Sequence, residues 1–136
     1  MSDQIRDIMT KNNVVLGYIF GSYGNNKANS MSDLDVAVVL PIDMTTAEER
    51  KIEQKIQTEI GHATGIDRID LINLRRCDNP VLRYSIIIEG NPIIVNDIAL
   101  RRYLEMMAVR DFEDTRFLRS MSYNILKRKT QTYVAA

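Results

Sequence analysis

The chain has 136 residues, of which 45% are hydrophobic and 26% charged. These values exclude wholesale disorder and predict a single domain over residues 1–136. Lysine plus arginine and aspartate plus glutamate number 18 each, so bulk charge argues against direct nucleic-acid binding. The only cysteine, Cys77, and the only histidine, His62, allow neither an internal disulfide nor a zinc site. With no membrane-length apolar run and no secretion signal, we expect a cytoplasmic protein without a membrane partner.

The first third of the chain predicts a short helix and two strands. Residues 2–13 carry apolar residues at helical spacing, with Ser2 as a candidate N-cap. Residues 14–20 are typical of a buried strand. Residues 21–32 are polar and rich in turn residues, which predicts a loop or a loop with one helical turn. A second strand over residues 34–40 ends at Pro41.

The middle of the chain contains the clearest helix. Ile52, Ile56 and Ile60 repeat every fourth residue after a threonine cap at position 45 or 46, and a glycine at 61 or 65 marks its end. A third strand is predicted over residues 68–74. Asn79–Pro80 favours a helix that runs to Glu89, followed by a short edge strand over residues 92–95.

Residues 97–130 form a C-terminal helical segment. The charged stretch at 110–114 favours a break and therefore two helices. The order of elements implies an α/β (α+β) fold, with a mixed sheet of about four strands, helices packed on one face and C-terminal helices.

Gly21 and Ser22 lie where a strand ends and a polar loop begins. Backbone N–H groups and the Ser22 hydroxyl can point at a phosphate there, and a glycine lets the phosphate approach. Taken alone, the pair is equally consistent with an ordinary turn after a strand.

Asp33 and Asp35 begin the second strand. Residues i and i+2 of a strand share a face, so both carboxylates face the same way while Leu34 points into the core. Two such carboxylates can converge on a hard divalent cation, for which Mg²⁺ is the best match. The alternative without a function is that Asp33 or Ser32 only caps the preceding loop.

A third acid, Asp70, interrupts the apolar strand at residues 68–74. If this strand lies beside the second one, Asp70 joins Asp33 and Asp35, and the three would form a metal site. Asp67 is the competing candidate, but its place at the strand start suits a turn. We therefore favour Asp70.

These residues resemble the signature of the minimal nucleotidyltransferase (MNT) antitoxins that pair with HEPN toxins, within the DNA polymerase beta superfamily. That signature is Gly-Ser, ten residues, Asp-x-Asp and a later acid in a strand. Gly21-Ser22, Asp33-Leu34-Asp35 and Asp70 match it, and the likeness covers about residues 14–95. Many relatives carry Ala-Arg-Gly in the loop, whereas this chain has Gly24-Asn25-Asn26-Lys27 and lacks that arginine. Lys27 is either a partial substitute, without the forked geometry of arginine, or an ordinary solvated loop residue.

The resemblance implies a polymerase beta-like fold and transfer of AMP from ATP to a tyrosine hydroxyl of a HEPN-type toxin, within a complex of the two proteins. It further implies Mg²⁺ held by Asp33, Asp35 and Asp70, with Gly21 and Ser22 binding the phosphates. Two alternatives stay open: nucleotide transfer to a small molecule such as an aminoglycoside, and an antitoxin that acts by binding alone. An apolar stripe at the C-terminus, including Met106, Met107 and Met121, is a candidate docking surface, although such a stripe more often belongs to the core.

Overall fold

The computed structural model describes residues 1–24 and 33–135, with side chains as far as Arg128. Of the loop predicted over residues 21–32, residues 25–32, including Lys27, lie outside the described residues. The helices and strands follow in the order α1 Ser2–Lys11, β1 Leu16–Phe20, α2 Gly21–Gly24, β2 Leu34–Val39, α3 Thr46–Thr64, β3 Ile69–Asn73, α4 Pro80–Ile87, β4 Asn91–Val95 and α5 Ile98–Ala135.

The four strands form one mixed sheet in the order β3-β2-β1-β4. β1 is antiparallel to both β2 and β4, whereas β2 and β3 run parallel. β4 lies at an edge, as its proline predicts, because an edge strand tolerates a missing N–H donor. The predicted α/β fold with a mixed four-stranded sheet is confirmed.

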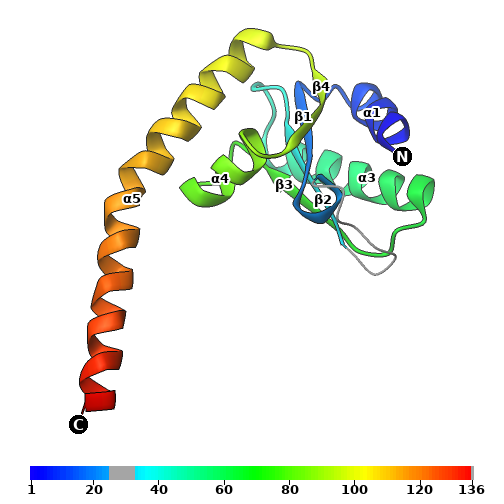
Figure 1. Ribbon diagram of the computed structural model, residues 1–136. Coiled ribbons are helices and arrows are strands. Elements are labelled where there is room, and N and C mark those ends of the chain that lie inside the picture. Colours follow the sequence, from blue (N-terminus) through cyan, green and yellow to red (C-terminus); the bar gives the residue numbers. More distant parts are fainter. Residues whose placement is uncertain (25–32, 136) are drawn as a thin grey trace.

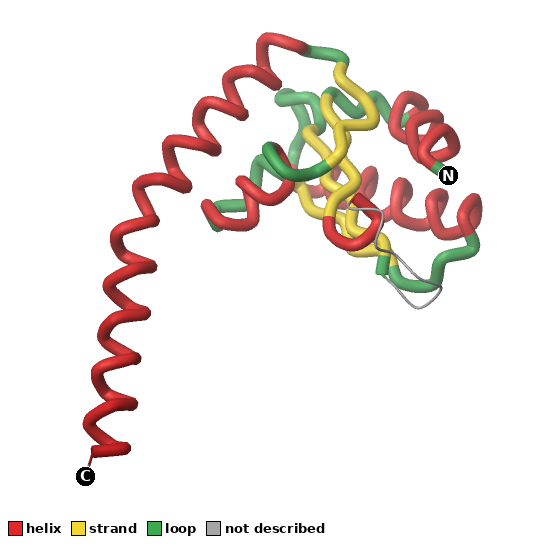
Figure 2. The backbone as a smooth tube through the Cα atoms, in the orientation of Figure 1, coloured by secondary structure: helices red, strands yellow, loops and turns green. Residues whose placement is uncertain are grey.

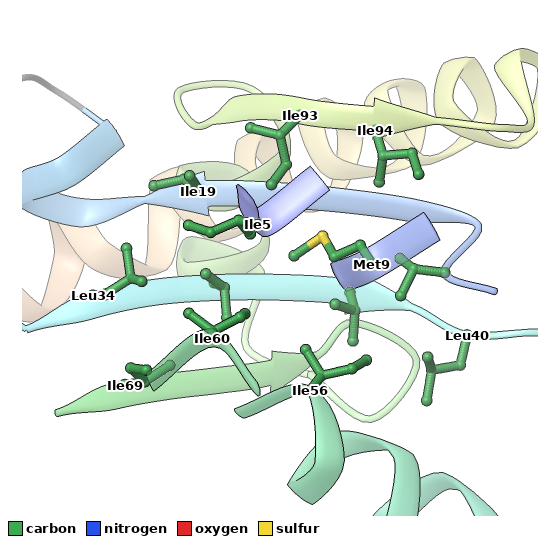
Figure 3. Packing of buried hydrophobic residues seen from close by; sticks show 13 residues of the cluster. Ile5, Met9, Ile19, Leu34, Leu40, Ile56, Ile60, Ile69, Ile93 and Ile94 are labelled. Atoms are coloured by element: carbon green, nitrogen blue, oxygen red, sulfur yellow. The ribbon is translucent and has the colours of Figure 1, made fainter. Parts of the chain in front are cut away.

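Helices cover both faces of the sheet, so the expectation that they pack on one face is wrong. α1 and α3 place Ile5, Met9, Ile56 and Ile60 against one face (Figure 3). α4 and α5 cover the other face with residues such as Ile86 and Ala108. The physical reason lies in β1 and β2, whose apolar residues run without alternation and therefore need cover on both sides.

α5 is one continuous helix of 38 residues rather than two (Figures 1 and 2). Its start is capped by Asp97, whose carboxylate accepts from the Leu100 N–H at 2.9 Å. The charged stretch at 110–114 does not break it, because arginine and glutamate are good helix formers and Phe112 supplies an anchor. The Phe112 ring stacks on Tyr84 of α4 at 4.1 Å. Among the described residues, no helix has the length and apolar character needed to cross a membrane.

The predicted start and end of α3 and the start of α4 are confirmed, whereas the cap of α1 is wrong and α4 ends at Ile87 rather than at Glu89. Thr45 caps α3 by accepting from the Glu48 N–H, and Gly65 ends it with φ +71°. Asn79 caps α4 by accepting from two backbone N–H groups. Ser2, in contrast, is the first residue of α1 rather than its cap, and no side chain caps that helix.

Candidate active site

The candidate site lies at one end of the sheet, where β1 ends and β2 and β3 begin. Phe20 pairs with Asp35 across β1 and β2, and Asp35 pairs with Asp70 across β2 and β3. Leu34, between Asp33 and Asp35, is fully buried beneath α1 and α3. Since side chains alternate along a strand, Asp35 and Asp70 lie on the opposite face, the one that α4 and α5 cover.

Asp35 and Asp70 interact directly. They are paired residues on the neighbouring strands β2 and β3. Partial burial, then the nearby charges of Asp70 and Asp33, and finally hydrogen bonding with Asp70 raise the pKa of Asp35. The site therefore disfavours its own full ionisation, and a cation placed between the carboxylates would remove that penalty.

Asp33 precedes β2 and takes part in an ion pair. Its Oδ1 lies 3.6 Å from Nε of Arg68, whose side chain is 81% exposed. Among residues 1–24 and 33–135, no three acids, histidines or cysteines are grouped so that they could hold a metal ion. The structure thus brings Asp35 and Asp70 together and places Asp33 beside them, paired with an arginine.

Position 21 favours glycine for two reasons, its backbone conformation and the proximity of Asp35. It has φ +68° at the start of the single helical turn α2, and a Cβ at this position would collide with Asp35 Oδ2. Ser22 is exposed in the same turn. The glycine thus allows the Asp35 carboxylate to lie against the chain, and the phosphate contacts of Gly21 and Ser22 remain predictions.

The donor set at this sheet end fits a hard divalent cation. Asp35 and Asp70 offer adjacent carboxylate oxygens, the ligand type that Mg²⁺ prefers, together with open positions for water or phosphate oxygens. Burial and the charges of Asp70 and Asp33 raise the pKa of Asp35, and a bound cation would oppose both causes. Asp33 can join them by exchanging its exposed arginine partner for the cation.

A cavity of about 570 Å³ lies between α3 and the start of β3, next to the acid pair. Its lining includes Gln57, His62, Asp67, Arg68 and Asp70. Both candidate third acids are exposed here, and the pairing with Asp35 distinguishes Asp70 from Asp67.

Arg68 is the site residue that sequence reasoning missed. It lies two positions before Asp70, so the same alternation that placed Asp33 beside Asp35 places Arg68 on the face of the acids. Cys77 lines a different cavity of about 350 Å³ at the far end of β3 and takes no part in this site.

Comparisons with known proteins agree with the geometry. A family model described as polymerase beta, nucleotidyltransferase matches residues 3–99. No curated protein sequence matches the chain.

Solved structures with the same fold include a mutant of the toxin–antitoxin MntA–HpeT, with a TM-score of 0.75 and 16% identity over 93% of this chain and 98% of that one. A toxin–antitoxin with AMP-PNP gives a TM-score of 0.72 and 20% identity over the same shares. A Shewanella oneidensis complex of a tri-AMPylated HEPN toxin with an MNT antitoxin gives a TM-score of 0.65 and 18% identity, over 93% of this chain and 99% of that one.

Proposed function

This chain belongs to the polymerase beta nucleotidyltransferase family, and we propose that it transfers AMP from ATP to a tyrosine hydroxyl of a partner HEPN toxin, which it thereby neutralises. The observation that carries the proposal is the Asp35–Asp70 pair beside Gly21, at the sheet end where the signature residues meet. The similar structures supply the choice of nucleotide and acceptor, since one contains AMP-PNP and another an AMPylated HEPN toxin.

The reaction is an in-line displacement. The tyrosine oxygen bonds to the α-phosphorus of ATP, the bond from that phosphorus to the bridging oxygen breaks, and pyrophosphate leaves. The hydroxyl proton passes to a carboxylate at the site, for which Asp70 is the candidate because it is exposed next to the cavity. No covalent bond to the enzyme is needed, so positioning and charge carry the catalysis.

Each signature residue has a place in this scheme. Asp33, Asp35 and Asp70 would hold Mg²⁺, which when bound neutralises charge on the phosphate oxygens. The Asp35 carboxylate lies close to Gly21, where a side chain would collide with it, whereas Asp33 would have to leave Arg68. Gly21 and Ser22 would bind the outer phosphates through α2.

The proposal also includes the location of the protein, its domain organisation and its partners. We place it in the cytoplasm, as a single catalytic domain with its C-terminal helix, in a hetero-oligomer with the toxin. ATP is the nucleotide substrate, and neither a membrane nor a nucleic acid is required.

The test uses ATP labelled on its α-phosphate, together with Mg²⁺ and the HEPN-type protein encoded beside this chain. Wild-type protein should label the toxin at tyrosine and abolish its RNase activity. Asp35→Asn and Asp33→Asn should each remove the label. Gln54→Ala, which changes a neighbouring cavity residue that is not an acid, serves as the matched control and should retain transfer.

Other outcomes distinguish the alternatives. Neutralisation of the toxin without any transferred label would establish an antitoxin that acts by binding. Label on a small molecule such as an aminoglycoside, with no effect on the toxin, would replace the protein acceptor.

A further inference from the structure

A small cavity of about 260 Å³ lies where α4 and α5 meet the ends of β2 and β3. Its lining consists of two arginines and four apolar residues: Arg75, Arg83, Val39, Leu74, Leu100 and Leu104. All four apolar residues belong to the cluster between the sheet and helices α4 and α5. Asp35 lies near the start of β2 and Val39 at its end, so this cavity is separate from the candidate active site.

Backbone carbonyl groups hold both arginine side chains in place. Nε of Arg75 donates to the Leu40 carbonyl at 3.0 Å. Nη1 of Arg83 donates to the carbonyls of Leu74 and Cys77. Leu40 and Leu74 directly follow β2 and β3, so both guanidinium groups are fixed to the same end of the sheet. A group that is already fixed loses less conformational freedom when it binds a ligand.

Neither arginine forms an ion pair with a carboxylate within residues 1–24 and 33–128, whereas six other arginines in this part of the chain do. The remaining residues, 25–32 and 129–136, contain no aspartate or glutamate. Glu105, which follows the cavity residue Leu104, is already paired with Arg101 at 2.9 Å. Within the described chain, the two positive charges at the cavity therefore have no paired acid.

The free donors of these two groups fit an oxyanion. A guanidinium group carries five N–H donors in a planar fork. In the described residues, Arg75 uses only Nε and Arg83 only Nη1, so the other nitrogens of both groups make no hydrogen bond. Carboxylate and phosphate groups accept two parallel bonds from such a fork. Leu100 and Leu104 add apolar surface on which a short carbon chain can pack.

The volume of the cavity limits the size of the ligand. Pockets for drug-sized molecules measure about 300–1,000 Å³, and this cavity of about 260 Å³ is smaller. Its lining comes from the end of β2, the connection between β3 and α4, and both helices. Walls from four parts of the chain around so small a volume favour a small molecule over a segment of another protein.

We propose that this cavity binds a small organic anion. Arg75 and Arg83 hold its carboxylate or phosphate head, and its short carbon chain packs on Leu100 and Leu104. Neither arginine belongs to the nucleotidyltransferase signature, so the proposal does not rest on AMP transfer. A bound anion would join α4 and α5 to the same end of the sheet and would stabilise the folded protein by mass action.

Titrations followed by NMR chemical shifts, at physiological ionic strength, measure Kd for four probes. These are butyrate, butyl phosphate, inorganic phosphate and the neutral butyramide. Butyramide should bind at least about tenfold more weakly than the tighter of the two butyl anions, because it lacks the charge that strengthens hydrogen bonds to arginine. Inorganic phosphate should bind at least about threefold more weakly than butyl phosphate, because it has no carbon chain to bury. The tighter butyl anion identifies the acid group of the ligand as carboxylate or phosphate.

Variants of the two arginines place the probe in this cavity. Arg75→Met and Arg83→Met each remove one guanidinium group and keep an unbranched side chain, and each should raise Kd for the tighter anion at least about tenfold. The matched control is Arg102→Met, the same change at an exposed arginine of α5 outside the cavity lining. Screening by salt should keep its effect below about threefold. Arg83→Met also loses two bonds to carbonyl groups, so Arg75→Met is the variant whose fold is less affected.

Several outcomes would overturn the proposal. One is equal affinity for butyramide and the anions, and another is an unchanged Kd in both arginine variants. A third is that wild-type protein binds none of the anions, including the case in which the arginine variants weaken binding of the toxin, which would assign both arginines to a protein interface.

The cavity and the transfer reaction can fail separately. Asp35→Asn should bind the anions as tightly as wild type, because Asp35 lies at the other end of β2. Loss of anion binding in that variant would place the probe at the acid pair and refute the cavity. Absence of AMP transfer by wild-type protein that still binds the anions through Arg75 and Arg83 would refute only the transfer reaction.

Discussion

Replacing Asp35 with asparagine should make the folded protein more stable at neutral pH while it removes the activity. The pKa of Asp35 is raised above its usual 3.8, first by burial and then by Asp70 and Asp33. An acid whose pKa is higher in the folded state destabilises that state once it ionises. The penalty is absent below about pH 3.8, grows through the raised pKa and is complete above it.

The gain in stability expected for Asp35→Asn can be estimated from the repulsion between the carboxylates. Two unit charges 4 Å apart repel by roughly 1 kcal/mol in water and by about 4 kcal/mol near a protein surface. Asp35 is only half-buried and Asp70 is exposed, so solvent screening favours the lower figure. Asparagine also retains a donor for Asp70. We therefore expect a gain of about 1 kcal/mol, or about 3–5 °C in Tm for a domain of this size.

Thermal unfolding in the presence of a chelator measures this difference at pH 7 and again near pH 3.5. The gain should be present at pH 7 and vanish at the lower pH, where wild-type Asp35 is already protonated. Asp33→Asn is the comparison variant, and it should show a smaller gain, because it removes one like charge near Asp35 but also loses the ion pair with Arg68. A variant that is less stable at pH 7, or equally stabilised at both pH values, would refute the reasoning.

Two further predictions concern the backbone and the helix caps. Gly21→Ala should lower the free energy of unfolding by at least about 2 kcal/mol, since it adds a collision with Asp35 to the strain of a positive φ. Gly65→Ala has a similar φ but open space around its Cβ, so chemical denaturation should show only the smaller backbone term of about 1 kcal/mol. Equal losses would contradict the collision. Asn79→Ala should cost about 1 kcal/mol by removing the α4 cap, whereas Ser2→Ala, which removes no cap, should change stability by less than about 0.5 kcal/mol in the same assay.

The sequence predicted the parts of the fold that local rules determine. Alternation along β2 put the two acids on one face, and the turn residues set the ends of α3 and α4. The juxtaposition of Asp35 and Asp70 needed one further condition, that β3 lies next to β2, and the structure meets it. Pairing between parallel strands is a long-range property, so the local pattern alone left that condition open.

The errors come from features that depend on tertiary contacts. α5 is unbroken because Phe112, a single apolar residue within the charged stretch, packs on Tyr84. The ion pair between Arg68 and Asp33 depends on how the start of β3 sits against the start of β2. The uninterrupted apolar run of β1 indicates that both sheet faces are covered. Which helix covers each face depends on the path of the chain between the strands and helices.

The arrangement of the site bears on how an acceptor would be selected under the proposed function. The acids are at the open end of the sheet, and Asp70 and Asp67 are exposed beside a cavity whose lining is largely polar and charged side chains. Such a site offers few apolar contacts with which to recognise a tyrosine ring. Recognition by docking at a separate surface supplies what the site lacks, because a bound partner holds its hydroxyl at high local concentration near the carboxylates. Acceptor choice would then depend on the fit of the whole partner protein, with the chemistry left to the acid pair.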